Sequence, residues 1–250
     1  MVLSVQNLSK AFGGLQALQG ATFDIAQDQI KSLIGPNGAG KTTALNLLSG
    51  VYPYDSGDII FQGINLKGLA HHQIANLGMA RTFQNGGLFL NLDVLNNILV
   101  GYHCRAKIGF ISSMFRLPTA VSEEKRIKDK ALQILDELEL SHKYNNPVDS
   151  LSLKEQRFVE IAIALVIEPK LMLLDEPCAG LNDTEIYDLK RLLFKIREKG
   201  ISILLVEHNM DLVMGVSDDI VVLNYGMKLA EGTPLEIRND KKVIEAYLGE

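Results

Sequence analysis

Three short apolar runs, each followed directly by polar residues, divide the chain; they cover residues 31–34, 171–174 and 201–206. Continuous apolar runs of this length are typical of strands that are buried on both faces of a parallel sheet. The first run leads into a glycine-rich segment, and the second leads into Asp175 and Glu176. The third leads into Glu207 and His208. Because ligands bind at the carboxyl ends of parallel strands, we expect these polar segments to meet in one site.

A helix is predicted after the second run, where apolar side chains recur at helical spacing at Ile186, Leu189, Leu193 and Ile196. Asp183 or Thr184 can cap the start of this helix, and Gly200 stands where a glycine ends many helices. Strands and helices therefore alternate, which predicts an α/β fold with a parallel sheet.

The N-terminal part and the middle of the chain follow other patterns. Short strand candidates predict a small antiparallel sheet beside the main one; they are Leu3–Val5, Ala21–Ile25 and Asp58–Phe61. The residues from about 94 to 165 show little strand signal, and one helix there is marked by Ile127, Ala131, Ile134 and Leu138. We therefore expect a single domain over residues 1–250, with a helical subdomain at about 94–165 inserted in its core.

The glycine-rich segment reads GPNGAGKTT over residues 35–43 and fills the pattern G-x-x-x-x-G-K-[ST] of a phosphate-binding loop. Glycines let the backbone curl until its N–H groups point at phosphate oxygens, and the helix predicted to follow directs its positive end at them. Lys41 can reach the β- and γ-phosphates, and Thr42 can ligate Mg²⁺. The alternative is a simple glycine-rich turn. We expect a nucleoside triphosphate to be held by Gly35, Asn37, Gly38, Ala39, Gly40, Lys41, Thr42 and Thr43.

Asp175 and Glu176 directly follow the second buried strand, so their carboxylates would meet the phosphates in a partly desolvated cleft. Asp175 can hold Mg²⁺ through water, and Glu176 can orient the attacking water and accept its proton. An Asp-Glu pair alone would be interpreted as an exposed loop. Beside a phosphate-binding loop, it predicts hydrolysis of the nucleotide.

Three further residues are open to two interpretations each. His208 ends the third strand, where it could contact the γ-phosphate or serve only the structure. Gln84 could belong to the nucleotide site or be an exposed hydrogen-bonding residue. Phe12 could stack on a nucleobase or belong to the core.

Composition and charge exclude several classes of protein. The 250-residue chain is 47% hydrophobic, so it can bury a large core. Its net charge of −5, without a dense Lys/Arg block, lacks the basic footprint of a nucleic-acid binder. Cys104 and Cys178 are too few for a disulfide framework. The start of the chain shows no secretory signal and the longest apolar segments are too short to span a bilayer, so we expect any membrane role to be peripheral.

The order of these motifs resembles the ATP-binding subunit of ABC transporters along nearly the whole chain. The shared elements are Phe12, GPNGAGKTT, Gln84, a helical insert, a signature position, LMLLDEP at 171–177 and His208. Longer matches resemble the larger ATPase subunit of branched-chain amino acid importers; they are ARTFQ at 80–84, VEIAIAL at 159–165, DEPCAGLN at 175–182, VEHNMDLVMGVSD at 206–218 and VIEAYLGE at 243–250. Close relatives of that subunit serve urea and amide uptake.

The resemblance implies a P-loop (RecA-like) ABC ATPase core, ATP and Mg²⁺ as cofactors, and roles for individual residues. Phe12 would stack on adenine. Thr42 and Gln84 would bind Mg²⁺. Glu176 would be the catalytic base, and His208 would contact the γ-phosphate.

The resemblance also implies partners. Two ATPase subunits pair head to tail, as a homodimer or a heterodimer, and each ATP lies between the phosphate loop of one subunit and the signature helix of the other. The pair drives two transmembrane permease subunits, which would dock near residues 85–101. We expect a cytoplasmic protein, peripheral on the inner face of the cell membrane, with an external solute-binding protein as a further partner and no nucleic acid.

The sequence departs from the family at the signature, where LSGGQ is replaced by Leu151-Ser152-Leu153-Lys154-Glu155. Ser152 can still offer its hydroxyl to the partner's ATP, or it can form a capping box with Glu155. Lys154 could pair with a phosphate as a point charge. We expect Ser152, Lys154 and Glu155 to face the partner's ATP. A second departure is Asn182, where many members of the family carry Asp.

These observations predict an importer ATPase that energises uptake of branched-chain or related amino acids. The ATPase of a urea or amide importer, or of a lipid exporter, would keep the fold and change the cargo. A non-transport clamp or regulatory protein is the alternative from another class. Clamp ATPases place hundreds of coiled-coil residues between the phosphate loop and the signature, whereas Lys41 and Leu151 are 110 positions apart.

Overall fold

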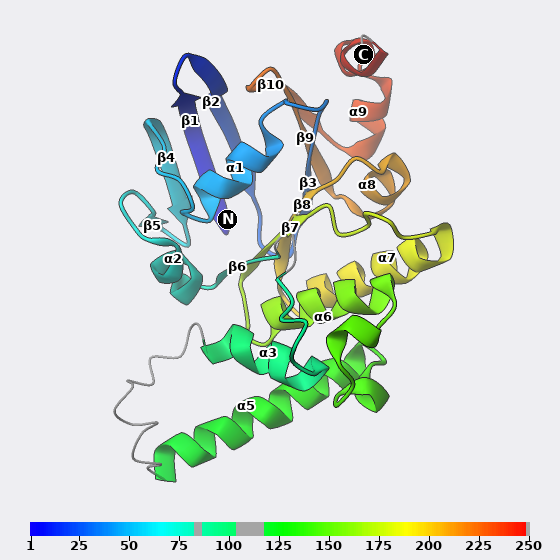
Figure 1. Ribbon diagram of the computed structural model, residues 1–250. Helices are drawn as coiled ribbons and strands as arrows, with labels where there is room; N and C mark the ends of the chain where they lie inside the picture. Colours follow the sequence, from blue (N-terminus) through cyan, green and yellow to red (C-terminus); the bar gives the residue numbers. More distant parts are fainter. Residues whose placement is uncertain (83–86, 104–117, 249–250) are drawn as a thin grey trace. The chain divides into compact units, whose positions relative to one another are not determined.

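The computed structural model describes residues 1–82, 87–103 and 118–248. These residues form two compact units (Figure 1): the first combines Met1–Arg81 with Lys170–Glu250, and the second covers Thr82–Pro169. Two parts of the sequence that lie far apart therefore build the first unit, and the second unit is inserted between them.

The first unit contains a six-stranded sheet in the order β10-β9-β3-β8-β7-β6. Its strands are β3 (Ile30–Ile34), β6 (Met79–Arg81), β7 (Leu171–Asp175), β8 (Ser202–Val206), β9 (Asp219–Asn224) and β10 (Met227–Gly232). All neighbouring strands are parallel except β9 and β10. Every residue of β3, β7 and β8 is buried, which confirms the buried parallel strands expected at the three apolar runs.

A four-stranded antiparallel sheet in the order β2-β1-β4-β5 confirms the second sheet expected near the N-terminus. Its strands are β1 (Leu3–Phe12), β2 (Leu15–Ile25), β4 (Ser56–Phe61) and β5 (Ile64–Asn65). β1 and β2 extend well beyond the short runs that the sequence predicted. Register shifts along β1, such as the one between Val5 and Leu8, interrupt the alternation of buried and exposed side chains, and this concealed the length of the strand.

The helices of the first unit are α1 (Lys41–Leu48), α2 (His71–Leu77), α7 (Asp183–Glu198), α8 (Met210–Val216), α9 (Pro234–Asn239) and α10 (Lys241–Leu248). The apolar residues expected to line α7 are buried. The predicted cap, Asp183 or Thr184, is wrong. The N-cap is Asn182, whose side chain accepts a hydrogen bond from Glu185 N at 3.1 Å, while the Glu185 carboxylate accepts one from Asn182 N at 3.0 Å. Gly200 follows the helix in a left-handed conformation, at φ +79°, as expected of a helix-ending glycine.

The second unit is built from helices: α3 (Val94–His103), α5 (Pro118–Glu137) and α6 (Leu153–Leu165), with 3₁₀ turns η1 (Ser141–Lys143) and η2 (Val148–Ser150). The apolar series that predicted a helix here is buried, with Leu138 just beyond the end of α5. Gly101 lets α3 lie close to α6, since a Cβ atom there would stand 2.4 Å from Ile163 Cγ2. Within the described ranges, no helix combines the length and the apolar content needed to cross a bilayer.

Candidate active site

The carboxyl ends of β3, β8 and β7 lie side by side, because these strands are consecutive neighbours in the parallel part of the sheet. The phosphate loop (residues 35–43) follows β3, and Glu176 and His208 follow close behind the other two strands. Glu176 N donates a hydrogen bond to Val206 O at 2.8 Å, and His208 Nδ1 lies 3.8 Å from Glu176 Oε1. The structure thus brings the three polar segments to one edge of the sheet.

Two glycines of the phosphate loop are required by the protein's own backbone. Gly35 has φ +149°, and a Cβ atom there would stand 2.1 Å from Leu223 O of β9. Gly40 has φ +103°, and a Cβ atom there would stand 2.5 Å from Ala17 O of β2. A Cβ atom on Gly38, at φ +78°, would meet nothing within 4 Å. The loop is therefore in close contact with both sheets at Gly35 and Gly40 and open at Gly38.

Lys41 is the first residue of α1, and its side chain folds back onto the start of the loop. Its Nζ donates to Gly35 O at 2.6 Å and to Pro36 O at 2.9 Å, and the residue is 9% exposed. The ammonium is held beside the amino-terminal N–H groups of α1, and both favour an anion. Thr42 is exposed in the first turn of α1, so its hydroxyl can reach a ligand.

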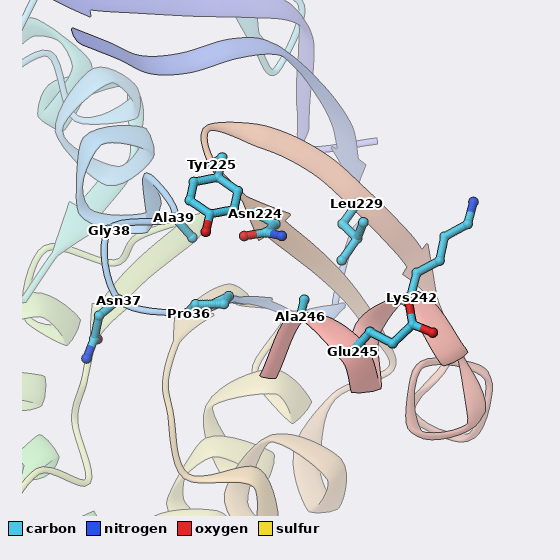
Figure 2. A pocket seen from close by; sticks show the side chains of 10 residues that line it. All are labelled: Pro36, Asn37, Gly38, Ala39, Asn224, Tyr225, Leu229, Lys242, Glu245 and Ala246. Atoms are coloured by element: carbon cyan, nitrogen blue, oxygen red, sulfur yellow. The ribbon is translucent and has the colours of Figure 1, made fainter. Parts of the chain in front are cut away.

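A pocket of about 560 Å³ adjoins the phosphate loop. Figure 2 shows Asn37 and Gly38 of the loop on one side, Tyr225 of the β9–β10 turn above them, and Lys242 and Glu245 of α10 opposite. A hydrogen bond joins the β9–β10 turn to the phosphate loop: Gly226 N donates to Ala39 O at 3.1 Å. The carboxyl-terminal helix therefore lies beside the phosphate loop, although the two are far apart in the sequence.

Asp175 ends β7 with a buried carboxylate that Arg81 of β6 contacts. Arg81 Nη2 lies 3.1 Å from Asp175 Oδ2. Nη1 of the same guanidinium donates to Asn46 Oδ1 of α1 at 2.7 Å and to Ser49 Oγ, just after α1, at 3.0 Å. Burial raises the pKa of Asp175, and the hydrogen bond and charge of Arg81 oppose that increase. Arg81 thus joins three segments around the site; the sequence showed it only as part of the ARTFQ motif.

Glu176 combines an uncommon backbone conformation with an accessible side chain. Its φ is +49°, which costs a residue other than glycine about 1–3 kcal/mol. Its side chain is 27% exposed, and that of His208 is 64% exposed. Water can therefore reach the Glu176 carboxylate, as a general base for hydrolysis requires.

Phe12 lies at the end of β1 and is 42% exposed, so it does not belong to the core. Its ring packs edge to face against Tyr52, with the ring centres 5.5 Å apart, and Lys10 Nζ lies 5.4 Å from the ring centre. An exposed aromatic ring of this kind can stack on a base. Gln84, the remaining residue proposed for the site, lies outside the described residues.

The altered signature begins α6 with a capping box. Ser152 Oγ accepts from Glu155 N at 3.3 Å, and Glu155 Oε2 accepts from Ser152 N at 2.9 Å. Lys143 Nζ donates to Glu155 Oε1 at 2.5 Å. Burial alone would raise the pKa of Glu155, but the hydrogen bonds from Lys143 and Ser152 outweigh burial and lower it. The capping interpretation is confirmed, and the Glu155 carboxylate is engaged within its own unit. Lys154 Nζ lies 5.8 Å from the centre of the Phe158 ring.

The oxygen atoms at this edge of the sheet fit a magnesium ion. Thr42 offers a hydroxyl group and Asp175 a carboxylate, and proteins hold Mg²⁺ through one or two carboxylates together with phosphate oxygens and water. Across the part of the chain that the structure describes, no group of three or more His, Cys, Asp or Glu side chains could hold a metal ion.

Two family models match the chain. One, described as ABC transporter, matches residues 18–179 and so covers the phosphate loop, Asp175 and Glu176. The other, described as branched-chain amino acid ATP-binding cassette transporter, matches residues 227–250, which contain β10, α9 and α10.

Known proteins align with the whole chain. BraF of Pseudomonas aeruginosa, a high-affinity branched-chain amino acid transport ATP-binding protein, is 42% identical over 250 residues, which cover 100% of this chain and 98% of BraF. LivG of Escherichia coli, a protein of the same description, gives the same identity and coverage. LptB of Escherichia coli, the ATP-binding protein of a lipopolysaccharide export system, is 33% identical over 248 residues, which cover 99% of this chain and 97% of LptB.

Solved structures show the same fold. An ATP-binding cassette of an ABC transporter in its ADP conformation matches with a TM-score of 0.89 at 32% identity, covering 100% of this chain and 99% of the other. A nucleotide-free cassette from an ABC transporter matches with a TM-score of 0.88 at the same identity and coverage. The expected fold, a phosphate-loop α/β core with an additional antiparallel sheet, is confirmed.

Proposed function

Because the chain belongs to the ABC transporter family of ATP-binding proteins, we propose that it energises a membrane importer for branched-chain or related amino acids. The chain is an ATPase of the ABC type and binds nucleotide. The proposal that the transported solutes are branched-chain amino acids rests on one observation. BraF and LivG, both named for high-affinity branched-chain amino acid transport, are 42% identical to this chain over its whole length.

Lipid export is a second candidate, because LptB is also similar over nearly the whole chain. Its identity is lower, at 33%. The match of residues 227–250 to a family model of branched-chain amino acid transporters supports import of amino acids over lipid export.

The residues at the edge of the sheet support specific roles in ATP hydrolysis. Glu176 would orient a water molecule and accept its proton while the water oxygen attacks the γ-phosphorus and ADP leaves. Lys41 and the N–H groups of the phosphate loop would neutralise the phosphate charge. His208, beside Glu176, would donate to the γ-phosphate, and Phe12 would stack on adenine.

The magnesium site would be formed by Thr42 and Asp175, with Gln84 as a further ligand. When bound, Mg²⁺ would offset the negative charge that develops on the phosphate oxygens during hydrolysis. Arg81 would set the orientation of the Asp175 carboxylate, because it contacts one of the two carboxylate oxygens.

The proposed assembly contains two permease subunits, a second ATPase subunit paired head to tail with this chain, and an external solute-binding protein, on the inner face of the membrane. The names of BraF and LivG, as ATP-binding proteins of transport systems, support membrane partners. In such a pair, Ser152, Lys154 and Glu155 at the start of α6 would face the ATP held by the other subunit.

We expect Lys154→Ala to reduce ATP turnover of the assembled transporter about fivefold, the effect of losing roughly 1 kcal/mol from an exposed charge pair. The affinity of this chain's own phosphate loop should not change. Lys154→Gly should preserve or raise turnover if backbone access to the phosphate matters more than charge. Turnover equal to that of the unaltered complex in both variants would show that this position does not act in hydrolysis.

Deleting the gene in its host should abolish high-affinity uptake of labelled leucine, isoleucine and valine, and the unaltered chain should restore it. Glu176→Gln is the control, because it should assemble with the permeases without restoring uptake. Labelled urea and measurement of lipid at the cell surface test the alternatives in the same cells. If branched-chain uptake survives the deletion while urea uptake or lipid export is lost, the proposed cargo is wrong.

A further inference from the structure

Glu207, the residue between β8 and His208, has a completely buried side chain. Its carboxylate is hydrogen-bonded on both oxygens by backbone N–H groups of two different loops. Oε1 accepts from Cys178 N at 2.8 Å, in the loop that follows β7. Oε2 accepts from His208 N at 3.0 Å and from Asn209 N at 3.3 Å, in the loop that follows β8.

We propose that Glu207 is a positioning residue for ATP hydrolysis, which fixes the loop of Glu176 relative to the loop of His208. The proposal rests on the roles proposed above for those two residues. We call the carboxylate and the N–H groups of Cys178, His208 and Asn209 the Glu207 bridge.

The bridge acts close to both proposed functional side chains. Cys178 is two positions after Glu176, whose left-handed backbone leaves its carboxylate 3.8 Å from His208 Nδ1. His208 Nδ1 also lies 4.0 Å from Glu207 Oε2, so this nitrogen is close to both carboxylates. Movement of one loop relative to the other would change the distance from Glu176 to His208, and displacements of about 1 Å can cost 10²-fold in rate.

The chemistry of the bridge requires glutamate. A carboxylate accepts hydrogen bonds at both oxygens, and hydrogen bonds from N–H groups to an ionised acceptor are stronger than neutral ones. Glutamine has one acceptor oxygen and one NH₂ group, so it would point a donor at an N–H group of one of the two loops. Aspartate keeps both oxygens, but its side chain is one methylene shorter and cannot reach both loops from the same backbone position.

The test measures ATP turnover, the KM for ATP and thermal unfolding of the full-length chain, alone and with its membrane partners. Glu207→Gln should lower kcat about 10- to 100-fold, the range seen when groups that orient a reactive residue are removed. The KM for ATP should change less than kcat, because the phosphate loop is not part of the bridge. Glu207→Asp should be slow as well, and it supplies the kcat measurement if the glutamine variant does not fold.

Glu231→Gln is the matched control, since Glu231 is another hydrogen-bonded glutamate of the first unit and accepts from Lys31 Nζ at 2.6 Å and Lys228 Nζ at 2.8 Å. It should lower the unfolding temperature and leave kcat unchanged. If Glu207→Gln lowers the unfolding temperature in the same way without lowering kcat, or if Glu207→Asp turns over like the unaltered chain, Glu207 is not a positioning residue.

Glu176→Gln in the same assay separates this proposal from the proposed roles on which it rests. If Glu176→Gln lowers kcat and Glu207→Gln does not, Glu207 has no positioning role, and the assignment of Glu176 as the general base stands. If Glu176→Gln hydrolyses ATP like the unaltered chain while Glu207→Gln is slow, the base assignment is wrong, and Glu207 positions a different group at this edge of the sheet.

Discussion

Replacing Glu176 by glutamine should slow ATP hydrolysis about 10²- to 10⁴-fold, the usual contribution of a general base, while MgATP still binds. The amide has the size of the carboxylate but cannot accept a proton from water. The backbone conformation at this position, with φ +49°, should be kept, because the substitution leaves the Glu176 N to Val206 O hydrogen bond in place.

Nucleotide titration and phosphate release, measured on the same preparation, check this expectation. Glu185→Gln is the matched control, because Glu185 belongs to the capping box at the start of α7 and glutamine can take its place there. A Glu176→Gln protein that releases phosphate as fast as the control would show that another group accepts the proton.

Replacing Lys41 by alanine should weaken ATP binding about 10²- to 10⁴-fold. Hydrogen bonds to charged groups contribute about 1.5–3 kcal/mol each, and the ammonium would contact two phosphates. Lys41 also donates hydrogen bonds to Gly35 O and Pro36 O, so its replacement removes two contacts that stabilise the loop as well as the charge.

Equilibrium titration with a fluorescent ATP analogue measures the loss, and Lys67→Ala, which removes an exposed lysine of the same unit, is the control. The control should bind like the unaltered chain. Affinity within a factor of about three for Lys41→Ala would contradict the assignment, since that factor corresponds to less than about 1 kcal/mol.

The sequence pattern predicted the strands that are buried on both faces and the helix whose apolar residues recur at regular spacing, because burial alone determines both patterns. It did not predict β6 or β9. β6 has three residues and becomes a strand only by pairing with β7, to which the chain returns after the second unit. β9 carries a similar apolar run at 220–223, but no motif residue follows it, so the pattern does not single it out.

The candidate site was predictable wherever a motif specifies the chemistry, as at the phosphate loop and at Asp175 and Glu176. Glu207 and Arg81 were not assigned roles, because each acts through partners that are distant in the sequence. A glutamate is normally an exposed residue, whereas the folded chain buries Glu207 and brings Cys178 N, from a distant part of the sequence, to its carboxylate. The cap of α7 was misplaced by one or two residues because Asn182, Asp183 and Thr184 can all cap a helix, and the choice depends on Glu185.

The contacts of the glycines explain part of the phosphate-loop motif. The two glycines that the pattern G-x-x-x-x-G-K fixes are Gly35 and Gly40, which face Leu223 O of one sheet and Ala17 O of the other. Gly38, at a variable position of the pattern, faces open space. Contacts with β9 and β2, as well as the shape of a phosphate, therefore require glycine at both fixed positions. A loop of this sequence grafted onto a protein without those two strands would lose one of the reasons for its glycines.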